Sequence, residues 1–160
     1  MEYWAKTLGI GPFFVKREIE FSEYRYRGQP CASPKVTIAL ANSGYVQVEL
    51  IQQHDDLPSI YKEFLESCRE GLQHVSAWLS RAEFDNRKAQ LLQRGLEIAQ
   101  ECTIPSSGVR LAYFSTDGVP GGLVYEISDI LEPSQYERVQ KIAEAAANWN
   151  GKQTVVEVKA

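Results

Sequence analysis

Three side chains in this sequence belong to residue types that bind divalent metal ions, and each lies in a stretch with the pattern of a β-strand. Glu49 occurs in residues 46–50, His74 in residues 72–79 and Glu126 in residues 123–130. One imidazole and two carboxylates form a ligand set for a divalent ion such as Zn, Ni, Co, Mn or Fe(II), with positions left for water or a substrate. The three residues are therefore candidate metal ligands.

Each of these residues also has an ordinary interpretation. A glutamate in a strand commonly lies on the wet face, and a single histidine in a strand is commonly a hydrogen-bonded packing residue. The second histidine, His54, lies in a polar loop and is left out of the site. The matching positions of Glu49 and Glu126 in an internal repeat, together with His74, place a shared site on an equal footing with the ordinary interpretation.

Strand alternation decides which neighbours share a face with the candidate ligands. The period of two places Gln47 on the same face of its strand as Glu49, and Trp78 on the same face as His74. We expect a half-apolar substrate pocket at these faces, lined by Gln47, Trp78, Tyr113 and Tyr125. Packing in the core is the competing interpretation of the three aromatic residues.

The internal repeat covers two pairs of neighbouring strands. Residues 36–44 resemble residues 109–118, and residues 44–49 resemble residues 121–126, with a glutamate five residues after a glycine in both copies. In the second copy a strand with His74 precedes a helix that ends near Gly95. Matching Gly95 to Gly9 places the counterpart of His74 about a dozen residues before Met1.

The first copy therefore lacks its first strand within this chain. We expect either that the chain is truncated or that the strand is borrowed, because an open module leaves a row of unpaired backbone groups. Residues 154–158, a rearrangement or a second chain could fill that position. A homodimer is the expected assembly.

The remaining pattern predicts an α+β fold in a single domain, residues 1–160. Ser134 and Glu137 have the spacing of a capping box at the start of a C-terminal helix. The expected parts are an incomplete first module (1–56), a linking helix (57–70), a second β-α-β-β-β module (71–131), and an extra helix with a short strand (132–160).

Composition excludes several classes of partner. The net charge is −4 with basic residues scattered among acids, so no basic stripe for nucleic acid is present. No run approaches the roughly 20 apolar residues of a membrane span, and no secretory signal opens the chain. Three widely spaced cysteines fit reduced thiols better than a disulfide framework. We expect a cytoplasmic protein whose partner is a small molecule.

Residues 4–13, 48–52 and 71–78 resemble the vicinal-oxygen-chelate superfamily of glyoxalases, bleomycin-resistance proteins and extradiol dioxygenases, and look closest to methylmalonyl-CoA epimerase and glyoxalase relatives. The resemblance implies paired modules that form a curved mixed sheet around a metal ion. It implies Glu49, His74 and Glu126 as ligands, with a fourth ligand in the missing strand. Gln73 stands where the family has a histidine.

The resemblance also implies a chemistry. The metal would chelate neighbouring oxygens of a substrate and stabilise an enolate-like intermediate, while Glu49 or Glu126 moves the proton as the catalytic residue. Because the superfamily includes lyases, isomerases, dioxygenases and drug-sequestering proteins, the fold does not select a reaction. A metal-dependent lyase or isomerase is the first expectation, and a metal-free small-molecule-binding protein is the alternative.

Overall fold

The computed structural model describes residues 1–67, 70–115 and 122–158, which form two compact units. The first unit comprises residues 1–19, 35–54 and those from Ser134 onwards, and the second comprises residues 20–34 and 55–133. Residues 20–34 lie within the expected first module, yet they belong with the second unit. Within the described residues, no helix is both long and apolar enough to span a bilayer.

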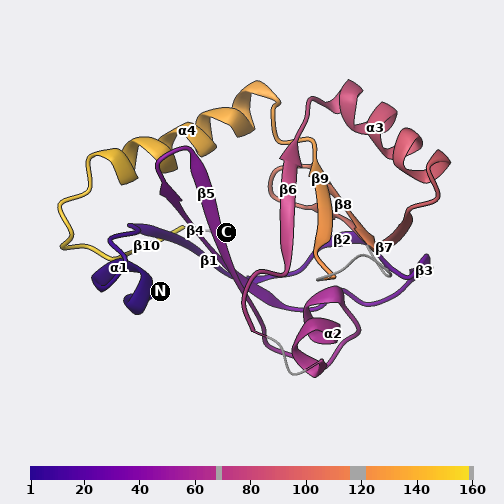
Figure 1. The fold of residues 1–160 in the computed structure, drawn as a ribbon, viewed down its shortest axis with the longest axis horizontal. Coiled ribbons are helices and arrows are strands. Elements are labelled where there is room, and N and C mark those ends of the chain that lie inside the picture. Colours follow the sequence, from indigo (N-terminus) through magenta and orange to yellow (C-terminus); the bar gives the residue numbers. More distant parts are fainter. Residues whose placement is uncertain (68–69, 116–121, 159–160) are drawn as a thin grey trace. The chain divides into compact units, whose positions relative to one another are not determined.

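The first unit is a four-stranded mixed sheet with two helices (Figure 1). The strand order is β10-β1-β4-β5, in which β1 and β5 pair antiparallel with β4, and β10 pairs parallel with β1. The elements are α1 (Glu2–Lys6), β1 (Phe13–Ile19), β4 (Val36–Ser43), β5 (Val46–Gln53), α4 (Pro133–Ala147) and β10 (Val155–Glu157).

Alternation along the strands gives the first sheet an apolar core on one face. Phe13 and Val15 of β1 pack with Ala39 and Ala41 of β4, and Trp4 of α1 covers them. Helix α4 contributes the buried side chains of Val139 and Ile142. Lys16 lies on the opposite face of β1. Its pKa is lowered by burial and by the nearby charge of Arg138 in α4.

The second unit is a six-stranded mixed sheet in the order β3-β2-β7-β8-β9-β6, with neighbours antiparallel except for the parallel pair β6 and β9. Its elements are β2 (Ser22–Tyr26), β3 (Gln29–Pro30), α2 (Ile60–Glu66), β6 (His74–Trp78), α3 (Arg81–Gln93), β7 (Glu97–Ile104), β8 (Val109–Ser115) and β9 (Val124–Ser128).

Helix α3 begins at a capping box and covers the core of the second unit. The Ser80 hydroxyl accepts from the backbone of Glu83, whose carboxylate accepts from the backbone of Ser80. The buried side chains beneath the helix are those of Phe84, Leu91, Ala112, Phe114 and Ile127. The capping box expected at Ser134 is not formed in this way, because α4 starts at Pro133 and Ser134 lies inside its first turn.

The strand register confirms the internal repeat. Leu40 lies opposite Glu49 in the pair β4 and β5, and Tyr113 lies opposite Glu126 in the pair β8 and β9. The sequence alignment of the two copies matches Leu40 with Tyr113 and Glu49 with Glu126, so both units hold their glutamate at the same place in the ladder. The α+β fold built from β-α-β-β-β modules is confirmed.

The first strand of the first module has no counterpart among the described residues. In the second unit β6 pairs with β9, whereas β5, the equivalent of β9, lies at the edge of its sheet. The expected linking helix is shorter than the pattern predicts, Ile60–Glu66, and residues 68–69 of that prediction lie outside the described residues.

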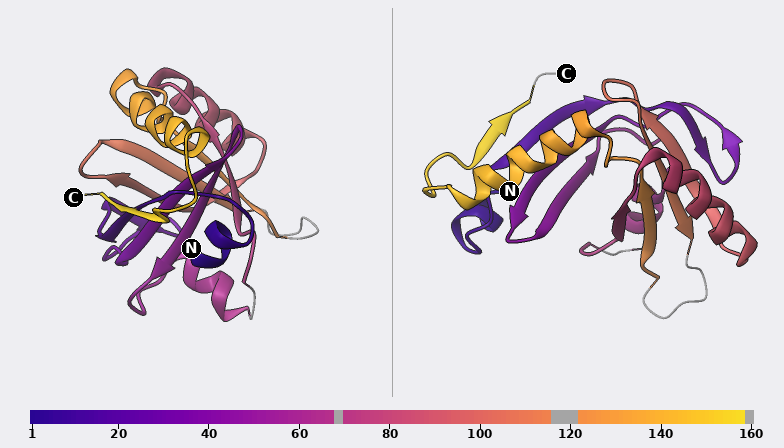
Figure 2. Two further views of the ribbon diagram at one scale, coloured as in Figure 1. Left: turned by 90° about the vertical axis from the view of Figure 1, so that its left-hand side faces the viewer. Right: turned by 90° about the horizontal axis from the view of Figure 1, so that it is seen from above.

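Residues 154–158 do not replace the missing strand beside β5. Strand β10 instead joins the opposite edge of the sheet, where Phe13 is in register with Val155 (Figure 2). The chain reaches that edge because the indole of Trp149 packs against Gly11, just before β1. The Trp149 ring nitrogen donates to the carbonyl of Gln153 at 2.8 Å, which sets the turn into β10.

Substituting Gly11 with alanine is expected to loosen this connection. A Cβ atom at Gly11 would lie 3.0 Å from Cη2 of Trp149, tighter than ordinary van der Waals contact. We expect a loss of about 1 kcal/mol in the free energy of unfolding, measured by urea denaturation. In the Trp149→Ala background the same substitution should cost much less, and equal costs in both backgrounds would show that the indole is not the cause.

Candidate metal centre

One face of the second sheet brings together His74, Glu126 and Tyr113 of the residues predicted for the site. Glu126 of β9 is in register with Ser76 of β6 on one side and Tyr113 of β8 on the other. Since alternate residues of a strand share a face, His74 lies on the same face as Ser76. We call the surface formed by His74, Ser76, Tyr113 and Glu126 the histidine face.

The centre of the histidine face is a close contact between His74 and Glu126. The distance from His74 Nε2 to Glu126 Oε2 is 3.3 Å, and the two side chains are only 11% and 7% exposed. Two ligands that each lie about 2.1 Å from one metal ion are separated by roughly 3.0 to 3.4 Å at octahedral or tetrahedral angles. The observed separation fits a pair of ligands that converge on one ion.

Neighbouring polar groups fix both members of this pair. The Ser76 hydroxyl donates to Glu126 Oε1 at 2.8 Å, so that both oxygens of the carboxylate are engaged. On the far side of the imidazole, His74 Nδ1 lies 2.6 Å from the side-chain oxygen of Gln73. Outer partners of this kind orient the first ligands of metal sites.

Aromatic side chains border the histidine face. The Tyr113 ring meets the His74 ring edge to face with centroids 5.6 Å apart. The hydroxyl of Tyr61 in α2 donates to the Tyr113 hydroxyl at 3.0 Å. Helix α2 begins where the Ser59 hydroxyl accepts from the backbone of Lys62, and its Glu63 carboxylate accepts from Arg27 at 2.9 Å. These contacts hold an apolar, aromatic wall beside the imidazole.

Two further buried groups lie on strand β7. The Gln100 side chain is fully buried, and its oxygen accepts from the backbone N–H of Ile60 at 3.2 Å and lies 2.8 Å from the Tyr24 hydroxyl. Burial raises the pKa of the Cys102 thiol far above its ordinary value, and the Glu126 charge adds to this effect. Cys102 is therefore a neutral packing group and not a thiolate ligand.

Two further residues predicted for the site, Trp78 and Tyr125, lie on opposite faces of the second sheet. Trp78 is half-buried and shares the alternation of His74 along β6. Tyr125 belongs to the opposite face, where it packs against the core under α3 and Arg87 lies over its ring at 6.0 Å. The structure does not bring Tyr125 to the histidine face, because it adjoins Glu126 along β9 and so points the other way.

Glu49 and Gln47 belong to β5 of the first unit, where both are half-buried. Gln47 donates from its amide nitrogen to the side-chain oxygen of Asn42 at 3.3 Å. The two residues share a face of β5, as the alternation predicts. Glu49 as a metal ligand and Gln47 as a pocket residue remain predictions.

Sequence reasoning did not single out Ser76, Tyr61, Gln73 or Gln100. Ser76 was detectable, since it lies two residues after His74 on the same predicted face. Gln73 was noted only as a departure from a family pattern. Tyr61 and Gln100 approach Tyr113 or its neighbours from other elements, and no local pattern in the sequence reveals such contacts.

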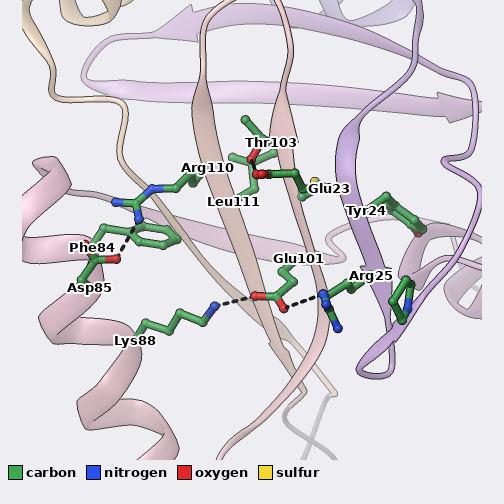
Figure 3. Close-up of a pocket in the computed structure, with 12 residues that line it drawn as sticks. Glu23, Tyr24, Arg25, Phe84, Asp85, Lys88, Glu101, Thr103, Arg110 and Leu111 are labelled. Atoms are coloured by element: carbon green, nitrogen blue, oxygen red, sulfur yellow. Dashed lines mark hydrogen bonds and ion pairs between the residues drawn. The ribbon is translucent and has the colours of Figure 1, made fainter.

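The second unit also contains a cavity of about 460 Å³ that none of the predicted site residues lines. Figure 3 shows Glu101 between Lys88 and Arg25, and Arg110 bound to Asp85. The remaining acid of this cavity, Glu23, accepts from the Thr103 hydroxyl. Because its charged groups are engaged with one another or with a hydroxyl, this cavity is a weaker candidate than the histidine face.

No curated protein matches the sequence. Among solved structures, one titled "Crystal structure of SMU.1112c" is 17% identical, with 79% of this chain and 85% of that chain covered and a TM-score of 0.31. The family model that matches residues 1–113 is described as the Glyoxalase/Bleomycin resistance protein/Dioxygenase superfamily. The match covers well over half of the chain, which therefore belongs to the glyoxalase, bleomycin resistance protein and dioxygenase superfamily.

Proposed function

We propose that the protein is a metal-dependent lyase or isomerase that binds neighbouring oxygens of a small molecule and transfers a proton. The observation that carries the proposal is the 3.3 Å contact between His74 Nε2 and Glu126 Oε2 on a largely buried face. An imidazole and a carboxylate are ligands for Zn, Ni, Co, Mn and Fe(II) alike, so the identity of the ion is left open.

The proposed ligand set is His74, Glu126 and Glu49. The first two converge within the second unit, and Glu49 is assigned because it holds the same ladder position as Glu126 in the repeat. Three protein ligands leave positions for a substrate, as in catalytic metal sites. When bound, a divalent ion would polarise the substrate oxygens and stabilise the negative charge that develops on them.

The two glutamates have different parts in this proposal. Both carboxylate oxygens of Glu126 have neighbours: the Ser76 hydroxyl donates to Oε1, and His74 lies beside Oε2. A carboxylate held in place in this way is suited to be a metal ligand. The proton transfer is then assigned to Glu49, which must reach the carbon acid of the substrate to act. One side of the site is bordered by the hydrogen-bonded hydroxyls of Tyr61 and Tyr113 and by the half-buried Trp78. We assign to these side chains the exclusion of water and the orientation of the substrate.

The metal content of the protein tests the proposal directly. Protein purified without chelator is expected to carry a transition metal near one equivalent, measured by elemental mass spectrometry. The His74→Ala variant should lose it, whereas the matched His54→Ala variant should keep it, because His54 contacts Thr37 in the first sheet and is not a proposed ligand. Absence of metal in the wild type, even after divalent ions are added, would overturn the proposal.

A metal-free binding protein of the same fold is the second candidate. It is favoured by one observation, namely that the Ser76 hydroxyl already donates to the buried carboxylate of Glu126 without an ion. In that case the aromatic residues around Tyr113 would hold an apolar ligand. Binding of a small molecule that is unaffected by chelator would support this second candidate and argue against the first.

A further inference from the structure

The side chain of Gln73 contacts the imidazole of His74 on the side away from Glu126. Its oxygen lies 2.6 Å from His74 Nδ1. The Gln73 carbonyl accepts from the backbone of Val124 at 3.0 Å, which anchors the residue beside β9. Its amide nitrogen is buried without a hydrogen-bond partner among the described residues. Gln73 therefore meets the imidazole through a single short contact.

The contact with Gln73 bears on which nitrogen of the His74 imidazole carries the proton. A neutral imidazole carries one proton, on either Nδ1 or Nε2. A metal ion at Nε2 needs the lone pair there, so the proton must be on Nδ1 and must be accepted by a neighbour. The amide oxygen of Gln73 is at the right distance to be that acceptor.

The other tautomer is also available to His74. With the proton on Nε2, the imidazole would donate to Glu126 Oε2, and the amide of Gln73 would have to turn so that its nitrogen donates to Nδ1. An amide can take either orientation, whereas a carboxylate at the same position accepts only and a thioether scarcely bonds at all. In the structure the oxygen of the Gln73 amide faces Nδ1, which is the orientation that accepts a proton from that nitrogen.

We propose that Gln73 is a positioning residue that accepts the Nδ1 proton of His74 and keeps the Nε2 lone pair directed toward Glu126. The proposal rests on the proposed metal site and adds the group that prepares its histidine. It gives a role to the glutamine that stands where the resembled family has a histidine.

Metal titration of three variants tests the effect on affinity. Gln73→Met keeps the length of the side chain and removes the strong acceptor, and is expected to raise the dissociation constant for Zn²⁺ about 10- to 100-fold. Gln73→Glu restores an acceptor and should bind at least as tightly as the wild type. Gln93→Met, at the exposed end of α3, is the matched control and should change nothing.

The tautomer itself is measurable in the metal-free protein, because the chain has only two histidines. In a long-range proton–nitrogen NMR spectrum at alkaline pH, where imidazoles are neutral, wild-type His74 should be protonated at Nδ1. Gln73→Met should shift the proton toward Nε2. The His54→Gln variant assigns the two ring systems.

The outcomes separate this proposal from the function on which it rests. Gln73→Met binding Zn²⁺ within twofold of the wild type, while His74→Ala does not bind, would refute the positioning role and leave the metal site intact. A wild-type His74 protonated at Nε2 would refute it as well. If no form binds metal but the wild-type proton is on Nδ1 and moves in Gln73→Met, the proposed function fails and the role of Gln73 stands.

Discussion

Replacing Glu126 with glutamine is expected to reduce metal affinity more than any substitution of an outer partner does. Loss of an outer partner typically costs about 10- to 100-fold in affinity. The Glu126→Gln variant removes a ligand charge from a side chain that is 7% exposed and leaves a neutral amide beside His74. We expect a loss of well over 100-fold, measured by titration of the chelator-treated protein with Zn²⁺ or Co²⁺.

Two control variants make the Glu126 result interpretable. Ser76→Ala removes the hydroxyl that donates to Glu126 Oε1 and should cost no more than the outer-partner range. Glu97→Gln removes the same charge from an exposed position at the start of β7 and should leave affinity unchanged. A Glu126→Gln variant that binds metal like Glu97→Gln would show that Glu126 is not a ligand.

Removal of the Asp129 carboxylate is expected to cause the largest loss of stability. The side chain is fully buried, and it accepts from the backbone N–H and the Nε of Arg110, both at 2.7 Å. Breaking a buried pair typically costs about 3 to 5 kcal/mol. Because Arg110 is 30% exposed, we expect Asp129→Ala to lower the free energy of unfolding by about 3 kcal/mol, measured by urea denaturation.

Asp85→Ala is the matched control for Asp129. Its carboxylate also accepts from Arg110, at 2.7 Å, but the Asp85 side chain is 63% exposed. Exposed ion pairs contribute less than about 1 kcal/mol, so this variant should unfold close to the wild type. Similar losses in the two variants would show that burial of Asp129 does not determine its contribution.

The sequence predicts the fold well where the pattern is local. Strand β9, Val124–Ser128, lies within the stretch 123–130 whose alternation has the pattern of a strand. The repeat, which depends on strands next to each other in sequence, is confirmed down to the register of Glu49 and Glu126. The prediction of a capping box at Ser134 was wrong, because the spacing of a serine and a glutamate three residues apart also occurs by chance. The capping box that does form, at Ser80, was not predicted.

Pairings between distant segments could not be read from the sequence. Strand β2 pairs with β7, about 75 residues later, and β10 pairs with β1 from the other end of the chain. The same limit applies to the site. Alternation places His74, Ser76 and Trp78 on one face, but the contacts of Tyr61 with Tyr113 and of Gln73 with His74 depend on rotamers and packing. The homodimer stays a prediction.

The division of the chain into interleaved segments has a consequence for its synthesis. Strand β6, helix α3 and strands β7 to β9 of the second unit are all complete by Ser128, before the segment with α4 and β10 has been made. The first unit needs that last segment, because Val155 and its neighbours pair with β1. On a ribosome, the unit that carries His74 and Glu126 can therefore fold first, while the first unit must wait until strand β10 has been made.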